Sequence, residues 1–423
     1  MENFARKVKL VKISKRGIVA AIATAGLLFS GVAPANAADK EVVVWADEQR
    51  GPQLADLIEG NKTVAPGYVI KVKYFASLPA LQSAWEKATA ADGPDVVAGA
   101  IDFTAAAKSG RIVPLTLSSA VKKDLGTAAI SSQYYMGKSY GVPLDLDTTG
   151  FIWNKKFGAA PKTFQDLYNY YTKNKASKGL TGGICAIDGI WGAQPIFTAL
   201  GGGAWGYTAS GEPVPSKTNL NSAAFKANVK KYLVGANGKS NGLFKWDGCT
   251  EDFLAGKIPA ANTGAWNFGK FDSAKISYSV SALPGLTATS KGAQWVNYSG
   301  AFVTAYAKTH GVELGAKQLV GGYFASPSGQ LAMSKLSQRP PASAKAAAGV
   351  SSANTKAIAL AGQKGIPQIG AMLDNKISGS NWYDTVIAAF KSILNNGANI
   401  STTLDKAATA VKKNFVEGAK SLK

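Results

Sequence analysis

The sequence predicts an α/β protein built from two lobes. Strand-like and helix-like segments alternate behind an apolar N-terminal stretch, as is typical of a mainly parallel sheet covered by helices. The chain has 423 residues, which is long enough for two lobes. Hydrophobic residues make up 46% of it, so large cores can form and a disordered chain is excluded.

The expected elements follow from hydrophobic periodicity and from turn residues. In the first part of the chain these signals favour strands at 41–45 and 68–75, a short strand within 93–102, and helices at 53–61, 81–90 and 104–109. Further on they favour a strand at 184–187, helices at 162–174, 220–235 and 402–416, and a connection with helices at 342–361.

Residues 141–156 read GVPLDLDTTGFIWNKK and pose a question about burial. Leu144 and Leu146 alternate with Asp145 and Asp147, which predicts a strand with one apolar and one polar face. A buried run, 151–153, follows directly. Since carboxylates tolerate burial only when they are hydrogen-bonded, the two aspartates are candidate functional residues.

The N-terminus reads as a secretory signal peptide over residues 1–37. Six Lys or Arg residues precede a stretch of apolar and small residues, and Ala35-Asn36-Ala37 supplies the cleavage site. A membrane anchor is the alternative, because the apolar stretch reaches the lower limit of a span. No cysteine lies near the site, so a lipid anchor has no support, and the cleaved chain would be exported and soluble.

Cys185 and Cys249 are the two cysteines of the chain. In an oxidising compartment they form a candidate disulfide, and the alternative is two separate buried thiols.

The formal net charge is +21, or near +16 once the signal segment is removed. The lysines are scattered and no nucleic-acid motif is present, so we expect no nucleic-acid partner. A solvated basic surface explains the charge, and retention on an anionic cell envelope is the alternative.

The residues of most enzyme classes are missing. His310 is the single histidine, so neither a multi-histidine metal site nor a zinc cluster is expected, and no cofactor motif is complete. Asp145 and Asp147 could serve as the acid and base of a glycosidase. However, they lie on one side of one strand, about 6.6 Å apart by strand rise, and would not flank a bond. We therefore expect no catalytic residue.

A binding constellation remains, with nine tryptophans and isolated carboxylates at strand ends. Carboxylates accept hydrogen bonds from sugar hydroxyls, and aromatic rings cover the apolar face of a sugar. In α/β lobes, ligands bind outside the carboxyl ends of strands.

Several segments together resemble one family. In order they are VVVWADEQRGP, ADGPDVVAGAIDF, SGRIVPL, GKSYGVPLDLDTTGFIWNKK, PKTFQDL, FLAGKIPAANTGAW, IPQ and NWYD, and they span essentially all of residues 41–416. Their order and spacing resemble the maltose-binding-protein type of extracellular solute-binding protein, the sugar receptors of ABC importers. The resemblance is specific for the family and does not identify the sugar.

The resemblance implies a two-lobed periplasmic-binding-protein-like fold with a ligand cleft between the lobes. Lobe one would contain residues 38–148 and about 298–350, and lobe two about 149–297 and about 351–423. The chain would cross between them near 147–150, 295–298 and 351–355.

The resemblance also implies the ligand-binding residues. Asp147 would be the cleft carboxylate, with Asp145 a second acceptor or a hinge residue, and either aspartate could instead be tied to backbone amides. The further ligand-binding candidates are Asp47, Gln49, Arg50, Asp102, Trp191, Trp266, Asn297, Tyr298, Arg339, Trp382 and Tyr383. Each tryptophan could instead belong to a core. Gly99 and Phe103 replace a family Trp and Arg, which argues against a longer maltodextrin subsite.

The sequence therefore predicts an exported, monomeric receptor for a disaccharide or short oligosaccharide of maltose or trehalose type. The sugar and the ABC permease would be its partners, and the compartment would be a periplasm or a cell envelope. The alternatives are a receptor of the same fold for a polyol, an amino-sugar or a polyamine, a secreted glycoside-active enzyme, and a structural envelope protein.

Overall fold

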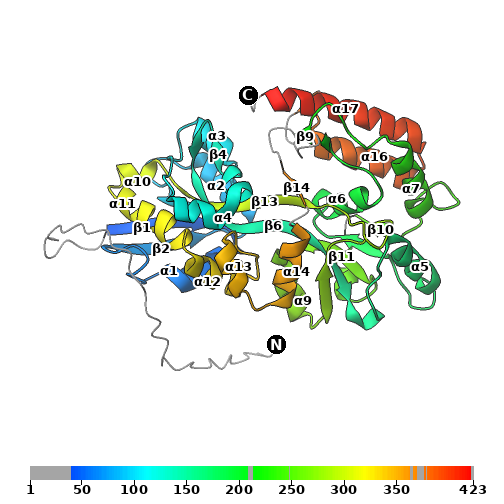
Figure 1. Ribbon diagram of the computed structural model, residues 1–423, viewed down its shortest axis with the longest axis horizontal. Coiled ribbons are helices and arrows are strands. Elements are labelled where there is room, and N and C mark those ends of the chain that lie inside the picture. Colours follow the sequence, from blue (N-terminus) through cyan, green and yellow to red (C-terminus); the bar gives the residue numbers. More distant parts are fainter. Residues whose placement is uncertain are drawn as a thin grey trace, which may run out of the picture. The chain divides into compact units, whose positions relative to one another are not determined.

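The computed structural model describes residues 40–207, 213–246, 248–362, 365–368, 376–377 and 379–420. The predicted signal peptide lies outside these residues. Residues 39–423 form one compact unit, in which helices pack around a ten-stranded sheet (Figure 1). The mixed α/β architecture predicted from the sequence is confirmed.

The main sheet has the strand order β10-β7-β11-β6-β13-β3-β1-β2, with β12 paired to β6 and β14 paired to β13. Its strands are β1 (Lys40–Ala46), β2 (Tyr68–Tyr74), β3 (Val96–Gly99), β6 (Gly141–Asn154), β7 (Ile184–Ala186), β10 (Phe244–Lys245), β11 (Ala260–Gly264), β12 (Tyr278–Ser281), β13 (Trp295–Val303) and β14 (Ile366–Pro367). Two small hairpins are β4 (Tyr134–Tyr135) with β5 (Lys138–Ser139), and β8 (Gly206–Tyr207) with β9 (Pro213–Val214). Pairing is parallel at both ends and antiparallel around β6 and β13, so the sheet is more mixed than predicted.

The helices of the first half are α1 (Gly51–Ile58), α2 (Leu78–Lys87), α3 (Phe103–Lys108), α4 (Ser119–Ser131), α5 (Phe164–Asn174), α6 (Ile190–Ala199), α7 (Ala223–Leu233), α8 (Thr250–Leu254) and α9 (Phe268–Ser273). Those of the second half are α10 (Tyr306–Thr309), α11 (Glu313–Gln318), α12 (Pro327–Ser337), α13 (Ala344–Gly349), α14 (Ala353–Gly362), α16 (Trp382–Asn396) and α17 (Ile400–Lys420). Short turns of other helix types are η1 (Lys155–Phe157), η2 (Ala265–Asn267) and η3 (Leu319–Phe324).

Two helices begin earlier than the hydrophobic pattern predicted, because capping residues set the start. The backbone N–H of Ala80 donates to the Ser77 side chain, which therefore caps α2 and starts it at Leu78. Proline in the first turn of α1 fixes its start at Gly51. The helix then ends at Ile58, before the predicted end.

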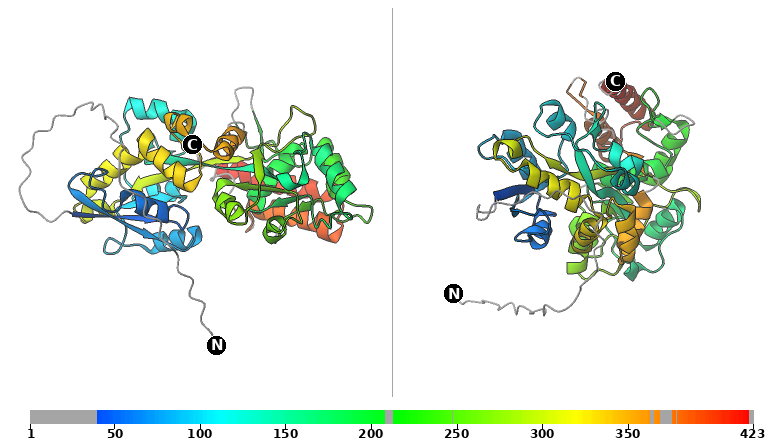
Figure 2. Two further views of the ribbon diagram at one scale, coloured as in Figure 1. Left: turned by 90° about the horizontal axis from the view of Figure 1, so that it is seen from below. Right: turned by 60° about the vertical axis from the view of Figure 1, so that its left-hand side comes forward.

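Strand β6 passes from one hydrophobic core into another. Leu144 belongs to a core that also contains residues of β1, β3 and α12, whereas Phe151 and Trp153 belong to a core built with α5, α6 and α16. Its pairing partner changes from β13 to β11 at Thr148 and Thr149. Residues on both faces of this central strand are buried, so the prediction of one polar and one apolar face is wrong. Figure 2 shows the fold from two further directions.

Two further segments pass between the cores. Trp295 at the start of β13 lies in the core that contains Phe151 and Trp153, and Ala301 lies in the core that contains Leu144. After α13, which packs on α12 and α4, the chain continues into α14, which packs on β6 and β12. Strand β6, strand β13 and the segment from α13 to α14 therefore all connect the two cores, although they lie far apart in the sequence.

The two cysteines are joined. Cys185 of β7 and Cys249 before α8 form a disulfide with a Cα–Cα distance of 5.7 Å, inside a third core with Phe253 and Phe271.

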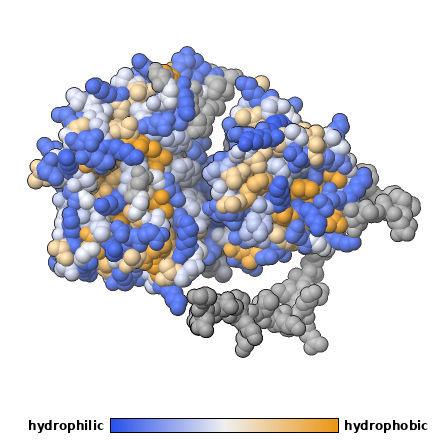
Figure 3. Space-filling view, turned by 180° about the vertical axis from the view of Figure 1, so that it is seen from behind, coloured by the Kyte–Doolittle hydropathy of each residue, from blue (hydrophilic) through white to orange (hydrophobic). Residues whose placement is uncertain are grey.

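The molecular surface is largely polar, with apolar side chains scattered singly over the face that Figure 3 shows. Among the exposed large hydrophobic residues, Tyr134 and Met136 share the β4–β5 hairpin, and the others, such as Leu360, come from separate elements. Among the described helices, none is both long and apolar enough to cross a bilayer.

Candidate ligand-binding site

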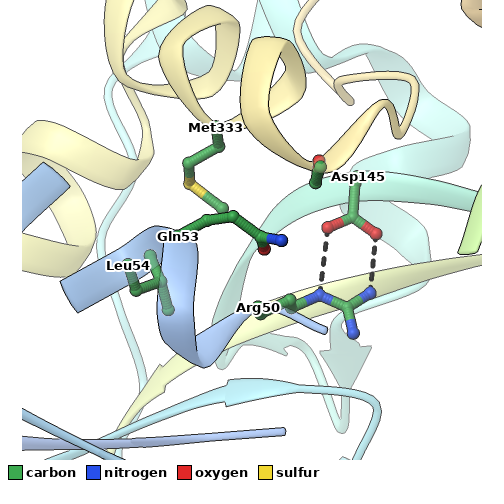
Figure 4. Close-up of a pocket in the computed structure, with 6 residues that line it drawn as sticks. Arg50, Gln53, Leu54, Asp145 and Met333 are labelled. Atoms are coloured by element: carbon green, nitrogen blue, oxygen red, sulfur yellow. Dashed lines mark hydrogen bonds and ion pairs between the residues drawn. The ribbon is translucent and has the colours of Figure 1, made fainter. Parts of the chain in front are cut away.

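A cluster of buried ion pairs lies where β1, β6 and α1 meet. Arg50, at the N-terminal end of α1, donates from Nε to Asp145 Oδ2 at 3.1 Å and from Nη2 to Asp145 Oδ1 at 2.8 Å (Figure 4). Its Nη1 donates to Asp47 Oδ2 at 2.7 Å. Asp47 follows β1 and also accepts from the backbone N–H groups of Gln49 and Arg50, at 3.0 and 2.9 Å. Asp47 therefore fixes the turn that aims Arg50.

Arg339 and Ser299 complete the cluster. Arg339, just beyond α12, donates from Nη1 to Asp147 Oδ1 and, at 3.3 Å, to Asp145 Oδ1, and from Nη2 to Gln49 Oε1. Ser299 lies opposite Asp145 on β13, accepts from Arg50 Nη2 at 2.5 Å and donates to Asp147 Oδ2. We call Asp47, Arg50, Asp145, Asp147, Ser299 and Arg339 the ionic cluster.

Two cations face three carboxylates in the ionic cluster. Burial alone would raise the pKa of Asp145, but Arg50 and Arg339 hold that pKa below its ordinary value. Burial and the neighbouring charge of Asp145 raise the pKa of Asp147, despite Arg339 and Arg50. Burial opposes the charge of Arg50, yet Asp145, Asp47 and Asp147 raise its pKa well above the ordinary value. Of the two aspartates of β6, Asp147 is therefore the weaker acid.

A void of about 10 Å³ lies beside the Arg50–Asp145 pair and is too small for a sugar. Gln53, Leu54, Met333 and Ser337 complete its lining (Figure 4).

A second polar group lies at the carboxyl ends of β7 and β11, which run parallel. Asp188 accepts from Trp266 Nε1 at 3.0 Å, from Asn267 Nδ2 at 3.4 Å and from Thr263 Oγ1. Burial raises the pKa of Asp188, although the bonds from Thr263 and Trp266 oppose the shift. The carboxylate thereby holds the Trp266 ring in place.

Trp266 joins the two groups. Its half-buried ring lies with its centroid 5.5 Å from the guanidinium carbon of Arg339, in cation–π geometry. Trp191 packs against Trp266 edge to face, with ring centroids 6.2 Å apart. The arrangement thus places two partly exposed indoles beside a guanidinium that binds Asp147.

The sequence analysis missed Asp188. A signal was present, because Asp188 follows the apolar run 184–187 as Asp102 follows the strand at 96–99, and polar residues at strand ends often face ligands. Arg339 was predicted, and its position between Asp147, Gln49 and Trp266 is more central than the sequence indicated.

The remaining predicted residues have different surroundings. Asn297 lies opposite Asp147 on β13, and Tyr298 beside it is half-buried. Tyr383 Oη accepts from Gln368 Nε2 at 2.7 Å. The exposed Asp102 accepts from the backbone N–H of Ala105 at 3.0 Å and caps α3, and within the described ranges no hydrogen bond or ion pair joins it to the ionic cluster.

Trp382 is fully buried and packs edge to face on Trp295 at 5.5 Å. It belongs to the core with α5 and α6, because the first residue of α16 points its indole inward. In this structure Trp382 therefore presents no face to a ligand, contrary to its predicted place as a sugar platform.

Gly99 and Phe103, which replace a Trp and an Arg of the family pattern, each lie close to a neighbouring side chain. The backbone of Gly99 has φ +153°, and a Cβ atom there would lie 3.1 Å from Asp47 Oδ2, so the backbone conformation favours glycine. Phe103 stacks on Phe302 with centroids 6.1 Å apart.

His310 lies outside both polar groups, and both nitrogens of its ring have hydrogen-bonding partners. Nδ1 faces Asp95 Oδ1 at 2.7 Å and Nε2 faces the Ala90 carbonyl at 2.8 Å. Burial opposes protonation, but the Ala90 carbonyl and Asp95 together raise the pKa of His310. In the part of the chain that the structure describes, no group of His, Cys, Asp and Glu side chains could hold a metal ion.

Strands β6 and β13 of this α/β protein run from one core into another, and buried ion pairs and two indoles lie near the point where they cross. This arrangement fits a solute-binding protein. The chain belongs to the family of bacterial extracellular solute-binding proteins, whose model matches residues 61–360, more than half of the 423-residue chain. The predicted resemblance is confirmed at the level of the family.

Two curated proteins are similar over much of their length. A galactooligosaccharide-binding protein of Bacillus subtilis (strain 168) is 26% identical over 301 residues, which cover 68% of this chain and 70% of that protein. A maltotriose-binding protein of Pyrococcus abyssi (strain GE5 / Orsay) is 24% identical over 256 residues, which cover 58% of this chain and 53% of that protein.

Proposed function

We propose that this protein is an exported receptor that binds a disaccharide or short oligosaccharide and delivers it to an ABC permease in the membrane. The observation that carries the proposal is the half-buried Trp266 ring, fixed by Asp188 and lying beside the Arg339 that binds Asp147. An aromatic face next to charged hydrogen-bonding groups suits a sugar, which offers an apolar C–H face and a ring of hydroxyls.

The names of the two similar proteins support a sugar over other solutes, because both names specify oligosaccharides. The guanidinium groups of Arg50 and Arg339 already pair with the three carboxylates of the ionic cluster, which disfavours a polyamine because its ammonium groups would have to compete for those carboxylates. A polyol or an amino-sugar is the alternative ligand within the same fold.

The two-lobe division is part of the proposal: residues 38–148 with about 298–350 form lobe one, and about 149–297 with about 351–423 form lobe two. The ionic cluster then belongs to lobe one, and Trp191, Trp266 and Asp188 belong to lobe two. A ligand that contacts both sets favours the closed form through its differential contacts.

Three residues are the proposed direct sugar contacts: Asp147, the weaker acid of the two aspartates of β6, and the two partly exposed indoles of Trp191 and Trp266. Gln49 and Arg339 reach the same space and would exchange their mutual bond for sugar hydroxyls. Asp47, Arg50 and Asp145 are fully engaged with one another, so we assign them to holding the passage between the lobes.

The remaining parts of the proposal follow from the family and from export. The signal peptide directs the chain to a periplasm or a cell envelope, where the monomer binds its sugar without a catalytic step and without nucleic acid. The family is named for binding a solute outside the cell, which supports this assignment.

Isothermal titration with malto- and galacto-oligosaccharides tests the proposal directly. We expect Trp266→Ala to weaken affinity at least tenfold, which corresponds to about 1.4 kcal/mol of lost ring contact. Tyr74→Ala, which removes an exposed aromatic ring of β2, is the matched control and should leave affinity unchanged. Equal affinities of the two variants would place the ligand elsewhere.

Incubation of the protein with the same oligosaccharides separates a receptor from a glycoside-active enzyme. We expect the sugars to be recovered intact. Products that disappear in Asp147→Asn would establish catalysis and refute the receptor.

A further inference from the structure

The positive charge of the chain is distributed unevenly. Residues 149–297 and 351–423 contain 25 lysines, no arginine and 11 acidic residues, a formal charge of +14. Residues 40–148 and 298–350 contain 16 cations and 13 acidic residues, a formal charge of +3. The basic character of the protein therefore belongs mainly to one part of the molecule, which an overall net charge does not reveal.

Part of this excess gathers around α5 and α7. Residues 167–187 and 213–246 contain nine lysines and no acidic residue. Helices α5 and α7 are neighbours in the structure, since Tyr232 Oη of α7 donates to Gln165 Oε1 of α5 at 3.0 Å. Lys175 Nζ joins the two segments directly by donating to the Asn241 carbonyl at 3.4 Å. Figure 1 shows α5, α7 and β10 at the same end of the sheet.

Five exposed lysines of these segments define what we call the basic face: Lys173, Lys175, Lys178, Lys231 and Lys239. Among the described residues, no ion pair includes one of these five lysines. The lysines of the region that do pair lie elsewhere, as Lys226 does with Asp405 at 2.7 Å. The charges of the basic face are therefore not neutralised by neighbouring carboxylates.

Tyrosine rings support the lysines of the basic face. The Nζ atom of Lys231 lies 4.6 Å from the ring centroid of Tyr232, and that of Lys178 lies 5.4 Å from the centroid of Tyr170. Such contacts hold the ammonium groups outward while the stems pack on aromatic surface. Tyr170 is half-buried and Tyr232 is buried, so the two rings support the lysine stems from below and leave the contact with a partner to the ammonium groups.

The composition of the face indicates what kind of partner it fits. Lysine is a hydrated point charge without the planar fork that arginine uses for bidentate phosphate recognition, so a diffuse attraction is favoured over one specific phosphate site. The large exposed hydrophobic residues, such as Met136 and Leu360, lie outside the face. Without an apolar anchor, contact with a bilayer would stay electrostatic and reversible.

We infer that the basic face binds the anionic surface of a lipid bilayer. The binding uses no residue of the ionic cluster and needs no sugar, so it stands or falls separately from the proposed receptor function. Each lysine close to an anionic surface strengthens binding several-fold, and five lysines together suffice for a weak, salt-sensitive association.

Co-sedimentation with vesicles tests the inference on a chain that begins at Asp39, since residues 39–423 form one compact unit and the basic N-terminal segment would add its own attraction. Equimolar phosphatidylglycerol and phosphatidylcholine vesicles are compared with pure phosphatidylcholine vesicles, without sugar. We expect binding to the anionic vesicles alone, and at least a tenfold loss when salt rises from about 50 to about 300 mM.

Charge reversal locates the surface. The triple variant Lys173→Glu, Lys178→Glu and Lys239→Glu should lower the vesicle partition coefficient at least tenfold. The matched control reverses Lys122, Lys123 and Lys138, three exposed lysines on α4 and β5, with the same change in net charge, and should lower it less than threefold. Circular dichroism checks that both triples are folded.

Three outcomes would overturn the inference. Equal losses in the two triple variants would show that net charge acts without a defined face. Binding to soluble polyphosphate, but not to anionic vesicles, would assign the lysines to a polymer. Absence of binding to either would leave the lysines as a solvated surface.

Discussion

Removing the Arg50 side chain should destabilise the protein strongly and in a pH-dependent way. In Arg50→Met the bonds to Asp47, Asp145 and Ser299 are lost, and three carboxylates remain with Arg339 as the single cation of the cluster. Breaking a buried ion pair on one side costs about 3–5 kcal/mol, because the abandoned charges stay desolvated. We therefore expect the free energy of unfolding at neutral pH to fall by about that amount.

The pH dependence gives the prediction a sign. In the wild type, the lowered pKa of Asp145 adds stability that is present above its unfolded pKa, about 3.9, and is lost as the pH falls through the lower folded value. Without Arg50, the buried carboxylates hold their protons more tightly in the folded than in the unfolded state. The difference between wild type and variant should therefore shrink as the pH is lowered.

Equilibrium urea unfolding followed by far-ultraviolet circular dichroism measures both effects. Arg111→Met is the control, because Arg111 likewise makes several side-chain hydrogen bonds, but donates to carbonyls and to Tyr306 and not to a carboxylate. It should destabilise the fold without the acid-dependent recovery. A loss below about 1 kcal/mol in Arg50→Met, or a loss that does not change with pH, would refute the account of the ionic cluster.

Three other changes have distinct expected results. Asp188→Asn should weaken sugar affinity about tenfold and broaden the near-ultraviolet signal of Trp266, because the indole N–H loses a charge-assisted acceptor; unchanged affinity would make Asp188 purely structural. Replacing Cys185 and Cys249 with serine should lower the free energy of unfolding by about 4 kcal/mol, from the 64-residue separation, as urea titration can check; a loss below about 1 kcal/mol would contradict it. In His310→Gln, the free energy of unfolding should fall by about 0.5–1 kcal/mol at low pH and match the wild type above the raised folded pKa of the imidazole. The reason is that the stabilisation by the protonated imidazole is complete below its unfolded pKa and is lost as the pH rises through the folded pKa. Thermal melts at several pH values test this direction.

The elements and the family were predictable from sequence because both depend on local pattern. The strand at 40–46 is a short apolar run, the strand at 68–74 alternates clearly, and the helix at 400–420 carries its apolar stripe where the pattern placed it. The burial of Asp145 and Asp147 was not predictable, because a period of two looks the same in a central strand and in an edge strand. Only the pairing of β6 with strands on both sides decides it.

The candidate site was predictable in its residue types and less so in the contacts between them. Asp147, Arg50 and Trp266 were proposed from motifs and stay predictions as ligand contacts, whereas the Asp188–Trp266 bond joins residues 78 positions apart, so no local pattern indicates it. Trp382 shows the opposite limit, since a tryptophan that matches a platform position by spacing can still turn into a core. Side-chain direction depends on packing that a single sequence does not contain.

Ligand-induced stabilisation is the most direct test of the receptor assignment. A chain from Asp39 to Lys423 is melted with mono-, di- and trisaccharides, polyols and polyamines, each in large excess. A ligand at about a hundred times its dissociation constant adds about 2.7 kcal/mol to the free energy of unfolding. We expect a clear rise in melting temperature with di- or trisaccharides, which Trp266→Ala abolishes. Stabilisation by polyamines alone, or by no solute in the panel, would contradict the account.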